Sequence, residues 1–228
     1  MNEPLIAAAM IRIILVLILG SGVFVITQRS LSSLISVYLV QSLLLAFLAL
    51  VLFWQEGHIN LLSISLLTLI SKVIIIPLFL RSVLKSLSIK RDAEFRYVTP
   101  ISSMLISIGL FFAVYQLFSK LSYELHFEPL FMLGAVIGVS LALMGMMVIF
   151  SRRKVITKTV GYLTMENGVL LFGLFVADLP FIIEVLILVD LLILLVLASL
   201  LAFGVDSSLE SFHKKLRNFG SDVENKYD

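Results

Sequence analysis

Long apolar stretches separated by short polar segments make up most of the chain. A helix that crosses a bilayer needs about 20 consecutive, mostly apolar residues. Seven stretches meet that length, and they are Leu5–Ile26, Leu31–Trp54, Ile59–Val83, Thr99–Ser119, Pro129–Phe150, Val155–Ala177 and Phe181–Gly204. The pattern therefore predicts an all-α, polytopic integral membrane protein with about seven transmembrane helices.

The amino-acid composition excludes several classes of protein and several kinds of site. Hydrophobic residues make up 60% of it and charged residues 14%, whereas soluble domains contain about half and a quarter. These values exclude an ordinary soluble domain, a disordered chain and a nucleic-acid binder. The chain has no cysteine, and its three histidines (His58, His126 and His213) lack ligand spacing. It also lacks a P-loop, a nucleophile elbow and a Gly-rich dinucleotide turn. We therefore expect no metal, no cofactor and no catalysis by the chain alone.

Basic residues concentrate on one side of the predicted membrane. Fourteen of the 17 lysines and arginines fall in alternate loops and in the tail, and only Lys120 falls in the opposite set of loops. Positively charged loops stay in the cytoplasm. The charges therefore predict an N-terminus outside the cell and a cytoplasmic C-terminus.

Four polar residues lie near the middle of predicted helices: Gln41, Lys72, Glu166 and Asp190. At about 1.5 Å per residue, each falls within about two turns of the bilayer centre. An ionisable group there costs at least about 2.5–3.5 kcal/mol, and it usually faces the bundle interior, pairs and marks an ion pathway. We predict a proton relay formed by Glu166, Asp190 and Lys72, with Gln41 in support.

Each of these residues also has a structural interpretation. Glu166 and Asp190 could share one proton without transport, and Lys72 could be the counter-charge of either carboxylate. The equal depth of Lys72 and Asp190 favours these two as a coupled pair. Gln41 could simply hold helices together. Tyr162 lies four residues before Glu166, on its face of the helix, and could bridge to it through water.

The first and last three predicted helices resemble each other weakly. Arg29 precedes Gln41 by twelve residues, as Lys154 precedes Glu166, and Lys72 stands in the third helix where Asp190 stands in the seventh. This echo favours a parallel duplication. The resulting units are an N-terminal three-helix unit with a basic cytoplasmic loop (1–98), a linking fourth helix (99–128), a second three-helix unit (129–204) and a cytoplasmic tail (205–228).

Glycines mark one face of the fifth predicted helix. Gly134, Gly138 and Gly145 share that face. Small residues at such spacing let membrane helices approach closely. We therefore expect a close helix pair here.

The stretch RRKVITKTVGYLTMENGVLLF (152–172) resembles the small K subunit of bacterial complex I and the small C component of Mrp-type cation antiporters. The shared pattern is a basic turn, a glycine, a midplane carboxylate (Glu166) and an asparagine one position later (Asn167). In the K-subunit family the carboxylate stands three residues earlier, where this chain has Leu163. Asp190 matches that family's second membrane carboxylate, shortened from glutamate. The resemblance implies that Asn167 supports the relay, and it covers residues 129–204.

The whole chain resembles the hydrogenase-4 component E family, through TMENG in the sixth predicted helix and through Lys72 followed by Pro77-Leu78. The resemblance implies a non-catalytic subunit of a complex I-related, group 4 hydrogenase-like complex in a bacterial or archaeal cell (inner) membrane. Its partners would be antiporter-like membrane subunits and a soluble arm of hydrogenase and iron–sulfur proteins. This chain would contribute a midplane proton or ion relay. The alternatives are a structural adaptor that positions an antiporter-like partner, a component of an Mrp-like antiporter, and a free-standing transporter.

The charge distribution makes a testable prediction about topology. Alkaline phosphatase fused after Asp228 should be inactive, because the enzyme matures only outside the cytoplasm and the basic loops place this end inside. A fluorescent protein fused at the same position should be bright. Phosphatase activity at Asp228 would show that the topology is inverted.

Overall fold

The computed structural model describes residues 3–86, 100–125, 128–152, 154–176 and 179–203. These ranges are almost entirely helical and contain no β-strand. The helices are α1 (Glu3–Thr27), α2 (Leu31–Glu56), α3 (Ile59–Thr68), η1 (Leu69–Ile75), α4 (Ile76–Ser86), α5 (Pro100–Leu125), α6 (Pro129–Ser151), α7 (Val155–Val176) and α8 (Leu179–Phe203). Most of the predicted basic loop after Ser86 and the whole tail lie outside the described residues.

Six of the helical stretches are long and apolar enough to cross a membrane. Five of them are α1, α2, α5, α6 and α7, and the sixth is the continuous stretch Ile59–Lys85, which is formed by α3, η1 and α4. The prediction of an all-α, multi-pass membrane protein is therefore confirmed. Helix α8 has 25 residues, of which Val185–Val196 form a described apolar segment.

The helix ends agree with the predicted stretches to within a few residues, apart from the fourth. Helix α5 runs to Leu125, although apolarity predicted an end at Ser119. Lys120 therefore lies in the last turns of this helix, and its prediction as a loop residue was wrong. A helix can thus continue beyond its apolar stretch.

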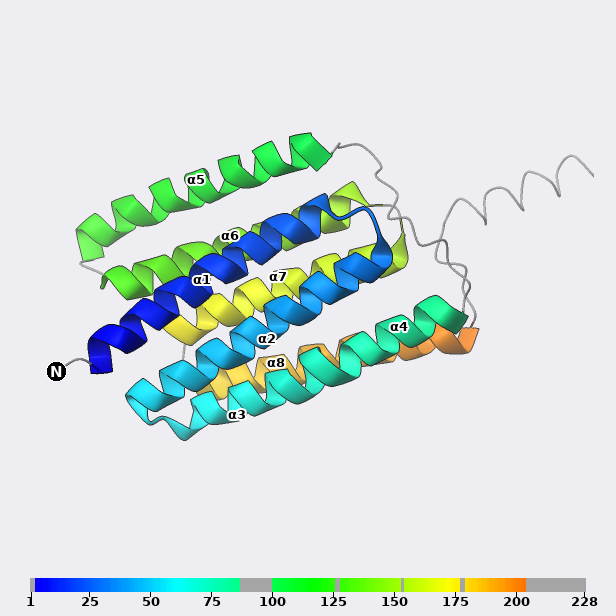
Figure 1. Cartoon of the computed structure of the whole chain (residues 1–228), viewed down its shortest axis with the longest axis horizontal. Helices are drawn as coiled ribbons and strands as arrows, with labels where there is room; N and C mark the ends of the chain where they lie inside the picture. The colour runs from blue at the N-terminus through cyan, green and yellow to red at the C-terminus, as the bar shows by residue number, and fades with distance from the viewer. Residues whose placement is uncertain (1–2, 87–99, 126–127, 153, 177–178, 204–228) are drawn as a thin grey trace, which may run out of the picture.

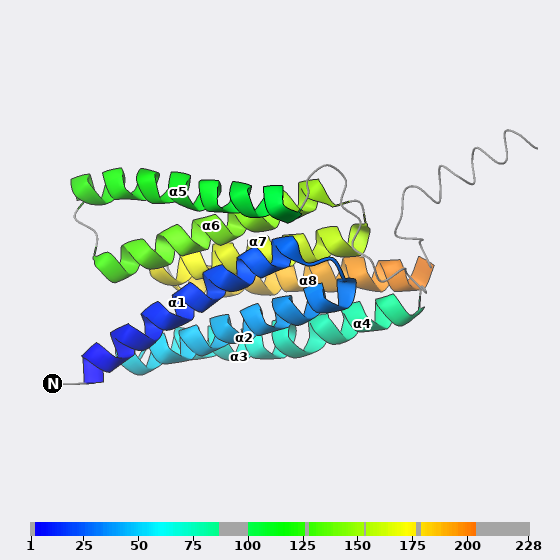
Figure 2. The same ribbon diagram turned by 45° about the horizontal axis from the view of Figure 1, so that its top comes forward.

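The helices form one bundle (Figures 1 and 2). Helix α1 packs against α2 and α6, α2 packs against α7, and α8 packs against α3, α4 and α7. Helix α5 lies at the edge of the bundle, against α6 and α1. The start of α1 and the end of α8 lie at opposite ends of the bundle (Figure 1). The helices of the two predicted three-helix units are therefore interleaved.

The core consists of two apolar clusters, one in each half of the bundle. The first contains Ile18, Leu45 and Leu171 and lies toward the N-terminal end of α1. The second contains Leu34 and Val160 and lies toward the other end of the bundle. Gln41 of α2, Lys72 of η1, Glu166 of α7 and Asp190 of α8 fall between these two clusters along their helices. The acidic and basic side chains buried within these four helices thus lie in one layer near mid-height.

Helices α6 and α7 approach most closely because glycines meet backbone across their interface. A Cβ atom on Gly138 would lie 2.6 Å from the backbone nitrogen of Phe172, and one on Gly145 would meet the backbone of Met165. Gly168 of α7 faces the backbone of Ala142 in the same way. This close contact holds α7, which carries two of the central polar residues, against the bundle.

Gly138→Ala should therefore destabilise the protein by about 1–3 kcal/mol, the usual cost of overpacking a close contact. Gly109→Ala on α5 is the matched control, since nothing lies within 4 Å of a Cβ atom there. The measurement is the melting temperature of the detergent-purified protein. Equal melting temperatures for the two variants would contradict a tight α6–α7 contact.

Candidate functional site

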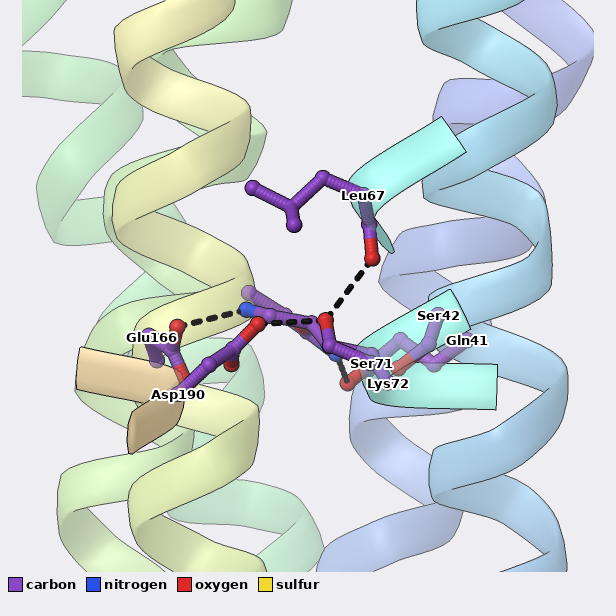
Figure 3. A network of polar contacts seen from close by, with 8 residues as sticks. Gln41, Ser42, Leu67, Ser71, Lys72, Glu166 and Asp190 are labelled. Carbon is purple, nitrogen blue, oxygen red and sulfur yellow. Dashed lines mark hydrogen bonds and ion pairs between the residues drawn. The ribbon is translucent and has the colours of Figure 1, made fainter. Parts of the chain in front are cut away.

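Four helices bring a cluster of polar side chains together at the centre of the bundle (Figure 3). Helix α2 contributes Gln41 and Ser42, η1 contributes Ser71 and Lys72, α7 contributes Glu166 and Asn167, and α8 contributes Asp190. We call these seven residues the central cluster. All of them are buried, and the exposed fractions of the two carboxylate residues are 8% for Glu166 and 4% for Asp190.

A π-helical turn presents Ser71 and Lys72 to the cluster. This turn, η1, interrupts an otherwise α-helical span, and Ile76 donates its backbone N–H to the carbonyl of Ser71, five residues earlier. Pro77 follows directly. Proline has no N–H to donate, and its ring would clash with the carbonyl four residues earlier. The wider turn accommodates the proline, and π turns of this kind often occur at functional sites.

Lys72 is fully buried and makes two strong contacts with α7. Its Nζ lies 2.7 Å from Oε1 of Glu166. It also donates a hydrogen bond of 3.2 Å to Oδ1 of Asn167. An ammonium group inside an apolar bundle needs such partners, because an unpaired charge there costs several kcal/mol. The contacts therefore fix η1 to α7.

Asn167 connects α7 to α2 through the nitrogen of its side-chain amide. Its Nδ2 donates to Oε1 of Gln41 and to Oγ of Ser42, at 3.1 Å each. Gln41 in turn donates to Oγ of Ser21 on α1, at 3.0 Å. One chain of hydrogen bonds thus runs from α1 through α2 and α7 to Lys72.

Asp190 reaches the cluster from α8. Its Oδ2 is hydrogen-bonded to Oγ of Ser71, the residue beside Lys72. The Asp190 and Glu166 carboxyl groups lie next to each other (Figure 3), and the charge of Lys72 acts on both. Oε2 of Glu166 and Oδ1 of Asp190 have no hydrogen-bond partner among the described residues. Neither oxygen receives a hydrogen from another described group, and the two carboxyl groups lie close enough to share a proton.

The structure brings together five of the six predicted site residues: Glu166, Asp190, Lys72, Gln41 and Asn167. The direct ion pair of Lys72 is with Glu166, rather than with Asp190 as equal depth alone favoured. Depth gives height in the membrane but not the direction of a side chain, so it could not choose between two carboxylates.

Tyr162 is the predicted site residue that the structure does not place in the central cluster. It is half-buried and packs against the second apolar cluster. Spacing along α7 puts it on the face of Glu166, but one turn away the bundle interior is already apolar. No direct contact joins Tyr162 to the central cluster among the described residues, and its role as a water bridge stays a prediction.

Ser71 and Ser42 were missed by sequence reasoning. Serine is common in membrane helices, where it usually bonds back to the carbonyl of its own preceding turn. The available signal was the position of Ser71 directly beside a buried lysine, within two turns of a proline.

Arg152 has a structural role that its position in a basic turn did not reveal. Its Nη2 donates to the carbonyl oxygens of Ile26 at 2.7 Å and Gln28 at 2.9 Å, at the C-terminal end of α1. Burial lowers the pKa of the Arg152 guanidinium to about 10, so the group stays charged at neutral pH. A cation there also complements the helix dipole. Arg152 thus caps α1 at the α6–α7 turn.

The fold and the central cluster define a multi-pass helical membrane protein with a buried lysine–carboxylate site. Comparisons with protein-family models, with curated proteins and with solved structures find no match to this chain. The chemistry of the site therefore rests on its own geometry.

A double-mutant cycle tests the ion pair. Lys72→Met and Glu166→Leu should each cost about 3–5 kcal/mol, because each leaves a buried charge without its partner. The double variant should recover much of this loss, since both charges are gone. The measurement is the stability and yield of the purified protein.

The matched comparison is the cycle of Lys72→Met with Asp190→Leu. Its coupling energy should be smaller, because Asp190 is hydrogen-bonded to Ser71 and not to Lys72. Additive losses for Lys72 and Glu166 would contradict the direct pair.

Proposed function

We propose that this chain is a non-catalytic membrane subunit of a complex I-related, group 4 hydrogenase-like complex, in which it carries protons or ions through a relay at mid-height. The observation that carries the proposal is the buried group of Lys72, Glu166 and Asp190 between two apolar halves of the bundle. Ionisable residues in such positions are costly, and they usually mark ion pathways.

The chemistry of the relay follows from the neighbours of each group. Glu166 and Asp190 take up and release protons, and their adjacent carboxyl groups allow a proton to pass between them. Lys72 stabilises whichever carboxylate is ionised, because a nearby opposite charge favours the charged form. Gln41 and Asn167 hold the surrounding helices in place without changing charge.

The proposal includes a topology and a location. Seven helices, α8 among them, cross a bacterial or archaeal cell membrane, with the N-terminus outside and the C-terminus in the cytoplasm. The end of α1, the end of α4 and the α6–α7 connection lie at the same end of the bundle (Figure 1). Arg29 follows α1, Arg81 and Lys85 lie in the last turns of α4, and Arg152 follows α6, so these basic residues support the orientation. Antiporter-like membrane subunits and a hydrogenase-type soluble arm are the partners that the sequence resemblance supports.

A structural adaptor is the second candidate function, and the Asn167 contacts favour it. This one side chain connects Gln41, Ser42 and Lys72, and so joins α2, η1 and α7. A network of this kind can hold helices for a neighbouring antiporter-like subunit, including one of the Mrp type. The adaptor needs the shape of the cluster but not its ability to exchange protons.

Glu166→Gln separates the two functions. The amide keeps the size and hydrogen-bonding capacity of the side chain but cannot release a proton. We expect the complex to assemble, because the amide oxygen still accepts a hydrogen bond from Lys72 and Asp190 can ionise to balance the lysine charge. Proton uptake by inverted membrane vesicles should be lost. Glu56→Gln is the matched control, since Glu56 is exposed at the end of α2 and should keep wild-type uptake. Full uptake by Glu166→Gln at normal complex yield would favour the adaptor.

A further inference from the structure

The hydroxyl group of Ser71 lies between two oxygen atoms. Its Oγ is 2.8 Å from the carbonyl oxygen of Leu67 and is also hydrogen-bonded to Oδ2 of Asp190 (Figure 3). A serine hydroxyl has one hydrogen to donate and two lone pairs that accept. It can therefore donate to one of these oxygens only, and it must accept from the other if both contacts are hydrogen bonds.

One assignment of protons makes both Ser71 contacts hydrogen bonds. A backbone carbonyl never donates, so Ser71 donates to Leu67 and accepts from Asp190. Asp190 must then be a carboxylic acid whose O–H, on Oδ2, points at Ser71. If Asp190 were ionised, Ser71 would donate to one acceptor and leave its lone pairs facing the other. Buried polar atoms rarely lack partners, because each unmade hydrogen bond costs about 1–3 kcal/mol.

The charges of the cluster lead to the same assignment. Lys72 and Glu166 form one ion pair at 2.7 Å, which is neutral as a unit. An ionised Asp190 beside it would leave a net negative charge inside an apolar bundle, next to a second carboxylate. Two adjacent carboxylates with one cation therefore favour a single shared proton. That proton on Asp190 makes the cluster neutral.

The oxygen atoms around Lys72 indicate whether the site exchanges a proton or a metal cation. The ammonium group lies between Oε1 of Glu166 and Oδ1 of Asn167. Carboxylate and amide oxygens of this kind are ligands of hard metal cations. The lysine already fills the position that such a cation would occupy between them, so the exchangeable species at this site is a proton.

We propose that the central cluster holds one exchangeable proton, which rests on Oδ2 of Asp190 and is donated to Ser71, and that the relay carries protons rather than sodium ions. This inference rests on the proposed function as a relay. Ser71 is a positioning residue in it, since it acts through the proton on Asp190.

The transfer step balances in atoms and charge. The O–H bond of Asp190 breaks, an O–H bond forms on Glu166, and the negative charge moves from Glu166 to Asp190. Ser71 then turns its hydrogen from Leu67 to the new Asp190 carboxylate. Lys72 remains beside both groups, so the cluster stays neutral in both states.

Infrared spectroscopy of the full chain in liposomes tests the proton's location without any turnover. A protonated carboxylic acid has a C=O stretch that a carboxylate lacks, and this band shifts in heavy water. We expect one such band at neutral pH. Labelling with carbon-13 aspartate should shift it, and labelling with carbon-13 glutamate should not. Absence of the band, or a shift with labelled glutamate alone, would overturn the assignment to Asp190.

Ser71→Ala tests the role of the serine. Loss of the acceptor should move the band to the higher frequency of a less strongly hydrogen-bonded acid, and Ser71→Thr should restore it, since threonine keeps a hydroxyl group. Ser65→Ala is the matched control on the same span, because Ser65 is buried but donates to the carbonyl of Ala46 at 2.8 Å. An unchanged band in Ser71→Ala would contradict the Asp190–Ser71 contact.

Exchange of potassium for sodium at constant pH and ionic strength tests the choice of ion. The band should be unchanged, and its loss in sodium would show that the metal ion displaces the proton. The infrared measurements test the location of the proton, whereas vesicle uptake tests the relay, so either result can be negative without the other. A proton on Asp190 without vesicle uptake overturns the relay but not the proton's location, and uptake without the band overturns the location alone.

Discussion

The cost of a buried ammonium group governs the centre of this protein. Lys72 is fully enclosed by the bundle, where an unpaired charge is unfavourable by several kcal/mol. Two neighbouring residues of α7, Glu166 and Asn167, supply the oxygens that make its burial possible. The π-helical turn before Pro77 presents Lys72 to that contact, and the close approach of α6 and α7 holds α7 against the bundle. Loss of Glu166 would therefore affect far more than one hydrogen bond.

The helix packing follows the weak echo in the sequence. Helices α1, α2 and α3–α4 of the first three-helix unit pack against α6, α7 and α8 of the last. Equivalent positions even meet, since Gln41 and Ser42 on α2 face Asn167 on α7. The two halves differ in charge, because Gln41 is neutral where Glu166 is ionisable, and Lys72 stands opposite Asp190. This difference places one cation and two carboxyl groups in a single layer.

Hydrophobicity alone was enough to predict the class of fold, because a bilayer allows only helices or closed barrels and sets their length. It also found Lys72, Glu166 and Asp190, since charged residues near mid-span stand out against an apolar background. Their pairing could not be predicted, because it depends on the rotation of each helix about its axis. The π turn shifts the direction of Lys72 relative to a regular helix, and no periodicity argument accounts for such a turn. Ser71 and Arg152 were hidden for a related reason: their partners, Asp190 and the end of α1, are more than 100 residues away in the sequence.

The central cluster divides its hydrogen bonds between groups that hold helices and groups that change charge. Ser21, Gln41, Ser42 and the Asn167 amide are neutral in every state, and they connect α1, α2 and α7. The two carboxyl groups lie on the far side of Lys72, and each keeps one oxygen without a hydrogen-bond partner among the described residues. A purely structural ion pair gains most when all its lone pairs are satisfied. A site that gains and loses protons instead needs a carboxyl oxygen without a hydrogen-bond donor. It also needs helix contacts that do not change when that oxygen is protonated. Because the neutral chain ends at Lys72, a proton can move between Asp190 and Glu166 without changing the hydrogen bonds that connect α1, α2 and α7.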